Sequence, residues 1–275
     1  MKKKITISLE ENILGRIDTN VRQWEGKNRS AVIESILKEK YWEFVDVTVI
    51  IFAHDRKWDN RPYPFSNPKP LLEARKRTII DRQIESFTKT GIKNIVLLIE
   101  KDSTESFEKE LLNKYPNIAF DLVEINSELK TGEALKIALT RKNTSKNLMI
   151  ANGDIFYGNL DIEGYYNYHK EQNWDISMLL KFVLNPEQLW NVAIHWNKVI
   201  WFVDRPKAKQ TYLTNSGLYL TTRDFLDQQD FWDYLEHTYF PKIVETENVI
   251  GYVYSWEWEH IQNDSAYERV NWWLM

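Results

Sequence analysis

The chain has 275 residues, of which 43% are hydrophobic and 28% are charged, with a formal net charge of −4 and no cysteine. This composition indicates a globular protein with one large core or two unequal ones, and it excludes disulfides, thiolate nucleophiles and zinc-thiolate sites. No apolar run is long enough to span a membrane, and the start MKKKITISLEEN becomes polar too early for a signal peptide, so a cytoplasmic protein without a membrane partner is expected.

The first 45 residues predict a small domain of one strand and two helices. Apolar and polar side chains alternate in KKKITISL, as in a half-buried strand, and apolar residues at helical spacing predict a helix over residues 11–23. A second helix is expected from Ser30, a good N-cap residue. One strand has no partner inside so small a domain, so we predict a homodimer in which two chains pair their strands.

This order of elements resembles the ribbon-helix-helix family, in which paired strands lie in the major groove of double-stranded DNA. The resemblance implies base contacts from the outward side chains of the strand and phosphate contacts from the start of the second helix. The alternative is a dimerisation arm with a solvated polar face, since nine Lys and Arg stand against only seven Asp and Glu in residues 1–45. The implied DNA-binding residues are Lys4, Thr6, Ser8, Arg29 and Ser30.

Residues 46–275 predict a second, larger domain in which strands alternate with helices. The expected strands are VTVIIFA, NIVLLIE, IAFDLVEI and NLMIAN, and the expected helices lie near TIIDRQIESFTKTG, SFEKELLNKY and TGEALKIALTR. Such alternation predicts an α/β fold with a mostly parallel sheet and helices on both faces. Ligands of these sheets bind at the carboxyl ends of the strands.

Six short stretches of this domain resemble, in order and spacing, the sugar-1-phosphate nucleotidyltransferases: PKP, LKTGEALKIAL, NGD, DRP, NSGLY and WEWEHIQNDSAYERVN. The likeness runs from about Val47 to the C-terminus and implies a Rossmann-like fold. Enzymes of that family join a sugar 1-phosphate to a nucleoside triphosphate and release pyrophosphate. The reaction brings an anionic oxygen to an anionic phosphate, so it needs a divalent cation, cationic side chains and N–H donors.

The resemblance assigns roles to individual residues of this chain. Asp154 matches the family's ligand for Mg²⁺, and Lys69 matches the lysine on the pyrophosphate side. Arg205 stands where the family has the lysine that meets the sugar phosphate. Each residue also has a simpler structural explanation, such as a strand-end cap, a solvated lysine or a turn glycine. The positions implied to contact the base or the sugar are Thr131, Gly132, Asn215 and Gly217.

The glycine-rich phosphate loop of the family is altered in this chain. An alignment on PKP places His54 and Asp55 at the paired glycines, Lys57 at the third glycine and Asp59 at the catalytic arginine. A carboxylate about 4 Å from a phosphate costs on the order of 4 kcal/mol at an effective dielectric near 20. Loss of an arginine that stabilises phosphoryl transfer commonly costs roughly a thousandfold in rate. The loop therefore predicts impaired catalysis.

Other departures leave room for activity. Arg56, Lys57 and Arg61 keep positive charge in the loop and are the candidate replacement contacts for nucleotide phosphates. His260 occupies the position of the family's second metal carboxylate, with Glu257 and Glu259 close by in the sequence but out of register.

Three functional hypotheses follow. The leading one is a dimeric DNA-binding transcriptional regulator whose large domain binds a nucleotide or nucleotide sugar without efficient catalysis. The alternative is an active sugar-1-phosphate nucleotidyltransferase dimerised by its small domain. A third is a protein-interaction scaffold, supported only by the eight of twelve Trp that follow residue 185. His54 and Asp55 also suggest a metal phosphohydrolase, but the chain lacks the histidine cluster that such enzymes need.

Overall fold

The computed structural model of the chain describes residues 6–23, 28–33, 36, 46–54, 68–126, 128–141, 144–172, 174–207 and 210–274. The chain divides into two compact units, Met1–Phe44 and Val45–Met275. Among the described residues, no helix is both long and apolar enough to cross a bilayer.

The first unit contains the first predicted helix, which is confirmed as α1, Glu11–Gln23. Residues 29–33 and 36 are helical as well, and Ile17 and Val32 supply buried apolar side chains. The prediction of Ser30 as the N-cap is wrong. Asn28 caps this helix, because its Oδ1 accepts a hydrogen bond from the amide of Ala31 at 2.9 Å, as an N-cap side chain does.

The predicted strand of the first unit is not observed where the structure describes it. Residues 6–10, which include Thr6 and Ser8, are exposed and form neither helix nor strand, and Lys4 lies outside the described residues. A lone strand lacks a neighbour within one chain to complete its ladder of hydrogen bonds. Arg29 donates from Nε and Nη2 to the carboxylate of Asp18 at 2.5 and 2.7 Å, so its guanidinium is occupied within the unit.

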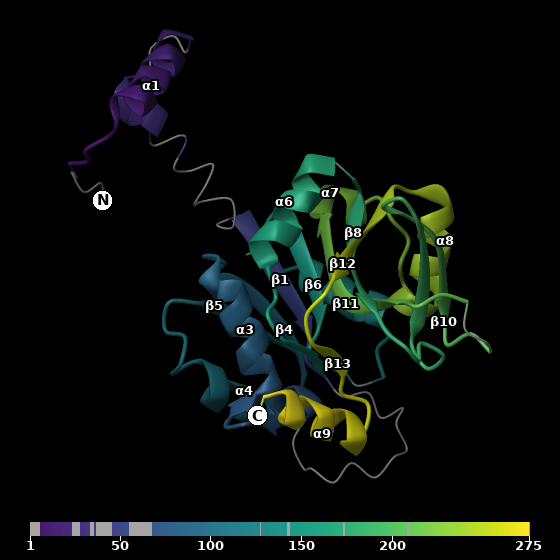
Figure 1. Ribbon diagram of the computed structural model, residues 1–275. Helices are drawn as coiled ribbons and strands as arrows, with labels where there is room; N and C mark the ends of the chain where they lie inside the picture. The colour runs from purple at the N-terminus through teal and green to yellow at the C-terminus, as the bar shows by residue number, and fades with distance from the viewer. Residues whose placement is uncertain are drawn as a thin grey trace. The chain divides into compact units, whose positions relative to one another are not determined.

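The second unit is built on a nine-stranded sheet in the order β5-β4-β1-β6-β11-β8-β12-β10-β9 (Figure 1). The strands are β1 Val47–Phe52, β4 Asn94–Glu100, β5 Ala119–Ile125, β6 Asn147–Asn152, β8 Ile176–Phe182, β9 Trp190–His195, β10 Lys198–Asp204, β11 Leu213–Thr222 and β12 Val249–Tyr254. Two small ribbons accompany the sheet: β2 Glu73–Ala74 with β3 Arg77–Thr78, and β7 Ile155–Tyr157 with β13 Trp258–His260.

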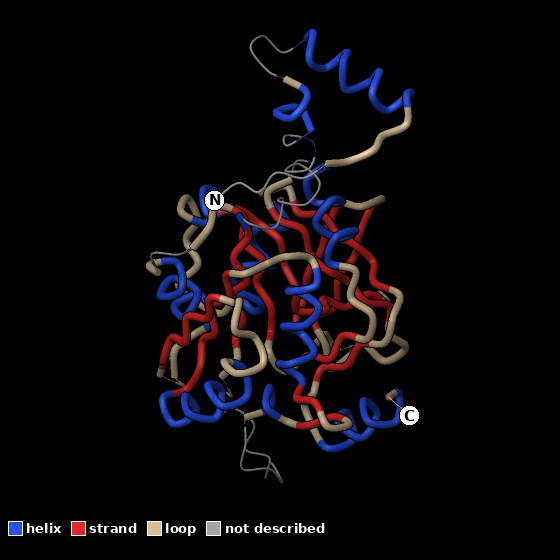
Figure 2. Tube along the Cα trace, turned by 90° about the vertical axis from the view of Figure 1, so that its left-hand side faces the viewer, coloured by secondary structure: helices blue, strands red, loops and turns tan. Residues whose placement is uncertain are grey.

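Helices flank these strands, as the two views of Figures 1 and 2 show. The α-helices of the second unit are α3 Ile79–Lys89, α4 Thr104–Leu111, α5 Thr131–Leu139, α6 Ile162–Gln172, α7 Arg223–Leu226, α8 Phe240–Thr246 and α9 Asp264–Trp273. Two 3₁₀ turns, η2 Lys69–Leu71 and η3 Lys101–Ser103, and one π-helix, η4 Leu235–Tyr239, are the other helical elements in the described part of this unit.

The predicted elements of residues 46–152 are confirmed in type and order, but the prediction of a mostly parallel sheet is wrong. β5, β4, β1 and β6 are parallel neighbours, as are β8 and β12. β11 instead runs antiparallel between β6 and β8, and β9 and β10 form an antiparallel pair across the turn at Trp196 and Asn197. A hairpin needs no crossover helix, so the alternation of strand and helix stops in the second half and the sheet becomes mixed.

Helices on both faces of the sheet are confirmed by the alternation of side chains along β8. Ile176, Met178 and Leu180 join the apolar cluster that includes residues of α5 and α8. Ser177 points the other way, where its Oγ lies 2.7 Å from Nδ1 of His169 on α6. Because successive side chains of a strand face opposite sides, α6 covers the face opposite to α5 and α8.

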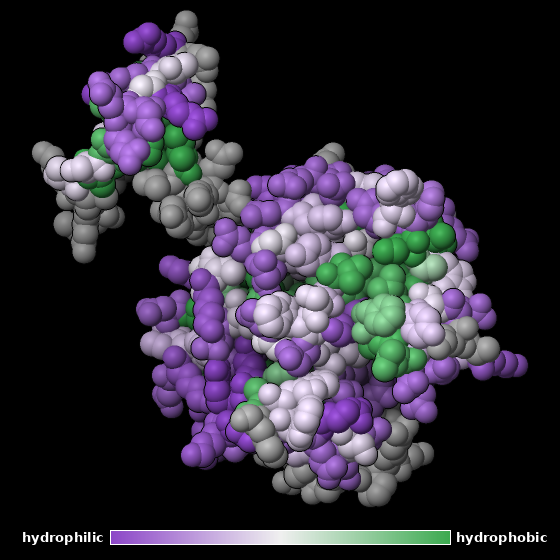
Figure 3. All heavy atoms as spheres, in the orientation of Figure 1, coloured by the Kyte–Doolittle hydropathy of each residue, from purple (hydrophilic) through white to green (hydrophobic). Residues whose placement is uncertain are grey.

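The space-filling view in Figure 3 shows a mostly hydrophilic face of the second unit, with hydrophobic side chains grouped over β10 and β12. Ile200 of β10 and Val253 of β12 are about half exposed, at 52% and 48%. Half-exposed apolar residues of this kind are ordinary on protein surfaces.

Candidate functional site

A tight turn at the carboxyl end of β6 positions Asp154. The amide of Gly153 donates to the carbonyl of Phe52 at 2.9 Å, and a Cβ on this glycine would lie only 2.8 Å from that oxygen. The turn therefore requires glycine, because the chain passes so close to the end of β1. Nε2 of Gln83 donates to the carbonyls of Asn152 and Ile155 at 3.0 and 2.6 Å, which fixes the backbone on both sides of Asp154.

A histidine from the far end of the chain lies directly beside Asp154. β13 pairs antiparallel with β7, with His260 opposite Ile155, and this register brings Nε2 of His260 to 3.1 Å from Oδ2 of Asp154. Nε2 of the Gln262 side chain donates to Nδ1 of His260 at 2.8 Å. Nδ1 is therefore an acceptor, and Nε2 carries the proton donated to Asp154. The two side chains remain 12% and 25% exposed, so a ligand can reach both of them.

Asp154 is a carboxylate in an environment that favours its charged form. Burial alone would raise the pKa of Asp154, but the electrostatic interaction and the hydrogen bond with His260, together with the charge of Lys69, hold this pKa well below its usual range. Lys69 is itself buried on η2, just after the loop of residues 55–67. The structure thus brings together the predicted metal ligand Asp154 and the predicted phosphate contact Lys69.

An aromatic ring covers the other side of His260. Trp190, the first residue of β9, stacks on the imidazole with ring centroids 5.4 Å apart and an interplanar angle of 24°. In the sequence, the tryptophans after residue 185 supported only the hypothesis of a protein-interaction scaffold. Trp190 was missed as a site residue because its place depends on the pairing of distant strands.

The same hairpin places Arg205 at the edge of this cluster. Asp204 pairs with Trp190 in the β9–β10 ladder, and the amide of Arg205 donates to the carbonyl of Leu189 at 3.0 Å. Burial raises the pKa of Asp204, and the charges of His237 and Arg205 oppose that shift. The side chain of Arg205 is 60% exposed, with Nε 3.8 Å from Asp204, so its guanidinium can turn towards an anionic ligand.

Asn215 and Gly217 shape an irregularity of β11 beside Asn152. Gly217 has φ 76°, and a Cβ there would lie 2.9 Å from Nδ2 of Asn152 and 2.5 Å from Cδ1 of Ile155. The buried Asn215 accepts from the amide of Gly217 at 3.1 Å and donates to the hydroxyl of Tyr219 at 2.5 Å. The structure gives both residues a role in backbone shape, and their contact with a sugar stays a prediction.

Thr131 and Gly132 lie at the start of α5, packed against residues 231–235. The Oγ1 of Thr131 accepts from the amide of Leu235 at 2.8 Å, and the amide of Gly132 donates to the carbonyl of Asp233 at 2.9 Å. A Cβ on Gly132 would lie 1.7 Å from the carbonyl oxygen of Phe231, so this position requires glycine. These contacts are structural, and a contact with a base stays a prediction.

One buried acid near the site was also missed by the sequence. Glu236 lies on η4 and is 5% exposed, with Oε1 3.5 Å from Nδ2 of Asn152. π-helical turns are rare and frequent at functional sites, and η4 also carries His237, the partner of Asp204 at 2.9 Å. No pattern in the sequence predicted the π-helical turn η4.

The altered loop lies outside the described residues from its second position onward, so Asp55, Arg56, Lys57, Asp59 and Arg61 are not described. Their predicted roles therefore stay predictions. In the part of the chain that the structure describes, no group of three or more His, Asp and Glu side chains is placed to hold a metal. Asp154 and His260 together offer one carboxylate and one imidazole.

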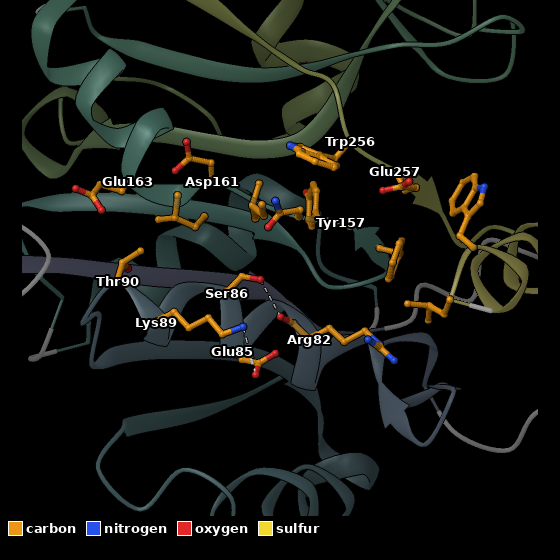
Figure 4. Close-up of a pocket in the computed structure, with 17 residues that line it drawn as sticks. Arg82, Glu85, Ser86, Lys89, Thr90, Tyr157, Asp161, Glu163, Trp256 and Glu257 are labelled. Atoms are coloured by element: carbon orange, nitrogen blue, oxygen red, sulfur yellow. Dashed lines mark hydrogen bonds and ion pairs between the residues drawn. The ribbon is translucent and has the colours of Figure 1, made fainter.

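A separate pocket of about 550 Å³ lies between α3, the start of α6 and the end of α9 (Figure 4). Its lining includes Arg82 and Lys89 but also four carboxylates, of which Glu257 lies beside Gly158. Gly158 and Glu257 are joined by a backbone hydrogen bond of 2.8 Å at one end of the β7–β13 ribbon. Asp154 and His260 lie at the opposite end of that ribbon. The excess of acids makes this pocket a poor phosphate site.

Comparisons with known proteins agree with this arrangement. The sequence model of the family described as nucleotidyl transferase matches residues 61–268. A Sulfolobus acidocaldarius protein named "Putative mannose-1-phosphate guanyltransferase" is 23% identical over 230 residues, which cover 82% of this chain and 62% of that protein. The Xenopus laevis mannose-1-phosphate guanyltransferase beta-B is 24% identical over 174 residues, which cover 61% of this chain and 48% of that protein.

The fold is shared with solved structures. HddC from Yersinia pseudotuberculosis superposes with a TM-score of 0.69 at 19% sequence identity, over 83% of this chain and 99% of that one. At this identity the likeness establishes the fold alone. The chain thus spans 62% and 48% of the length of these two guanyltransferases.

Proposed function

Because the chain belongs to the nucleotidyl transferase family, we propose that it is an active sugar-1-phosphate nucleotidyltransferase, which converts a nucleoside triphosphate and a sugar 1-phosphate into a nucleotide sugar and pyrophosphate. GTP and mannose 1-phosphate are the first substrates to test, since the relatives are named as mannose-1-phosphate guanyltransferases. The observation that carries the proposal is the ionised Asp154 at a strand end, beside Lys69 and His260.

The leading hypothesis from the sequence, a DNA-binding regulator with a degenerate enzyme domain, is wrong. The family match extends over most of the second unit, and the relatives are named as sugar-phosphate enzymes. The structure adds no support for DNA contacts, because Thr6 and Ser8 are not in a strand and Arg29 is paired with Asp18. The second unit is therefore the part of the chain to which we assign function.

The reaction forms a bond between an oxygen of the sugar 1-phosphate and the α-phosphorus. The bond from that phosphorus to the bridging oxygen of the β-phosphate breaks, and pyrophosphate leaves with the electron pair. Lys69 supports the proposal because a buried ammonium close to Asp154 can neutralise charge on the departing oxygens. Arg205 has an exposed guanidinium that can hold the sugar phosphate, and Trp190 offers a flat ring for the sugar.

A divalent cation fits the donor chemistry at Asp154. Its carboxylate is ionised and partly exposed, and carboxylate oxygens are ligands that Mg²⁺ accepts. Asp154 would hold the ion, beside Nε2 of His260 at 3.1 Å from its carboxylate. When bound, the ion would neutralise charge on the nucleotide phosphates.

The base and the sugar are assigned to the two sides of the β6 strand end. We assign the base to the side of Thr131 and Gly132 and the sugar to the side of Asn215 and Gly217. What supports these assignments is the backbone: α5 begins at the first pair, and β11 bends at the second pair next to Asn152.

Formation of labelled nucleotide sugar tests the proposal. The purified chain is incubated with Mg²⁺ or Mn²⁺, each of the common nucleoside triphosphates in turn, and mannose 1-phosphate or glucose 1-phosphate. We expect synthesis, reduced at least about a hundredfold in Asp154→Asn and Lys69→Ala. Lys89→Ala is the control, because Lys89 is an exposed residue paired with Glu85 on α3. Absence of a nucleotide sugar with every substrate pair would overturn the proposal.

A further inference from the structure

We propose that His260 is itself a metal ligand, and that Asp154 and His260 together select a first-row transition-metal dication such as Mn²⁺ over Mg²⁺. The inference deepens the proposed function and rests on it, since the ion is the one that nucleotidyl transfer needs. Mg²⁺ takes oxygen ligands almost exclusively, whereas imidazole nitrogen is a good ligand for transition metals. A site that offers one oxygen and one nitrogen therefore discriminates between the two classes of ion.

The separation of the two donor atoms already fits a shared ion. Oδ2 of Asp154 and Nε2 of His260 are 3.1 Å apart. Two neighbouring ligands of an octahedral ion, each about 2.1 Å from the metal, lie about 3 Å apart. A cation can thus replace the proton between these atoms without movement of the backbone.

The partner of His260 allows the required tautomer. In the absence of metal, Nε2 carries the proton and Nδ1 accepts from Gln262. For Nε2 to bind a metal, the proton must lie on Nδ1. Rotation of the Gln262 side-chain amide by half a turn brings its Oε1 to Nδ1. Nδ1 can then donate its proton to Oε1, so a hydrogen bond is kept. Metal-bound histidines almost always donate their second N–H to such a partner, which fixes the ring and the tautomer.

The surroundings hold the imidazole in place and leave room for the rest of the coordination sphere. Trp190 stacks on one face of the ring, and β13 fixes the backbone through its ladder with β7. Asp154 and His260 stay partly exposed, so phosphate oxygens of a nucleotide and water can occupy the other positions. Two protein ligands alone bind an ion weakly, and we therefore expect firm binding in the presence of nucleotide.

The competing interpretation is that His260 only donates a hydrogen bond to Asp154. The carboxylate then binds an ion through oxygen alone, and exchange of His260 for another donor leaves the choice of ion unchanged. The two interpretations differ in one observable, which is a metal–nitrogen bond.

Electron spin echo envelope modulation of bound Mn²⁺ reports that bond directly. The protein is prepared with natural or ¹⁵N-labelled histidine and mixed with Mn²⁺, with and without GTP. We expect a nitrogen coupling that changes with the isotope, persists in the control His195→Gln and disappears in His260→Asp, which still binds Mn²⁺. Competition between Mn²⁺ and Mg²⁺, followed by the free Mn²⁺ signal, should show that the preference for Mn²⁺ falls about tenfold or more in His260→Asp.

Circular dichroism establishes whether each variant folds. Should His260→Asp not fold, Gln262→Leu keeps the imidazole and removes only its partner, and we expect Mn²⁺ affinity to fall by about tenfold to a hundredfold. Bound Mn²⁺ without nitrogen coupling, or no Mn²⁺ bound with or without GTP, overturns the inference. Nucleotide-sugar synthesis distinguishes the two proposals, because synthesis without nitrogen coupling leaves the proposed function standing. Nitrogen coupling without synthesis supports the ligand and refutes the activity.

Discussion

Trp190 stacks on His260 with a centroid separation of 5.4 Å, which joins the hairpin that carries Arg205 to the ribbon that carries Asp154. The sugar side and the metal side of the proposed site therefore meet at one pair of rings. A change at Trp190 acts on both sides, through the flat surface offered to the sugar and through the support of the imidazole.

We predict that Trp190→Ala raises KM for the sugar 1-phosphate by up to about tenfold, because aromatic stacking contributes about 0.5–1.5 kcal/mol. Trp190→Phe keeps a flat ring and should retain most of the affinity. Steady-state kinetics with varied sugar 1-phosphate give the measurement. An unchanged KM in Trp190→Ala would show that the ring serves the imidazole alone.

Arg205 should act mainly in binding of the sugar phosphate. Its guanidinium is 60% exposed and, among the residues that the structure describes, is held only by a long contact with Asp204, so a phosphate can recruit it without breaking a buried pair. Arg205→Ala should raise KM for the sugar 1-phosphate about tenfold to a hundredfold, since a charge-assisted hydrogen bond contributes about 1.5–3 kcal/mol. Arg205→Lys should recover part of the loss. Equal kinetics for Arg205→Ala and the natural protein would remove Arg205 from the site.

The sequence predicted the first half of the second unit well, because β1, β4 and β6 are buried apolar runs and helices with regular apolar spacing lie between the strands. Val47–Phe52 is buried at every position, and Thr78 caps α3 by accepting from the amide of Asp81. The strand pairing of the second half was not predicted, because antiparallel strands such as β11 pair with partners that are distant in the sequence. Only the motif NSGLY marked β11, and it was interpreted as a ligand contact rather than as a bent strand.

The site was predictable where a motif ends a strand and not where it depends on distant pairing. NGD placed Asp154 at a strand end from the sequence alone, and β6 ends two residues before it. The contact of His260 with Asp154 needs the register of β13 on β7, and the stack on Trp190 needs β9 as well. No local pattern encodes these pairings. The importance of His260 was visible only as a departure from a family motif.

Gly132 is predicted to be essential for stability. An alanine methyl there would lie 1.7 Å from the carbonyl oxygen of Phe231 and 2.4 Å from that of Asp233, and backbone atoms cannot move aside easily. Gly132→Ala should therefore cost more than about 3 kcal/mol of unfolding free energy, as severe overpacking does. Gly15→Ala is the matched control, because nothing lies within 4 Å of its added methyl. Urea unfolding measures both, and equal midpoints would contradict the close packing of α5.

His169 is predicted to make the stability of the second unit depend on pH. Burial lowers the pKa of His169 to about 4, whereas the unfolded chain has the usual histidine value of about 6.5. As pH falls below about 6.5, His169 becomes protonated in the unfolded state but not in the native state. The contribution of His169 to the unfolding free energy is therefore fully present above that pH and is lost progressively down to about pH 4. The shift corresponds to a loss of at most about 3 kcal/mol.

The test is the unfolding free energy between pH 7.5 and 4.5 for the natural protein and for His169→Gln. Glutamine can still hydrogen-bond to the hydroxyl of Ser177, which lies 2.7 Å from Nδ1 of His169, but it cannot titrate. The variant is therefore expected to be somewhat less stable at pH 7.5 and to lose less stability than the natural protein on acidification. Parallel pH profiles for the two proteins would mean that His169 takes up its proton in the folded state as readily as in the unfolded one.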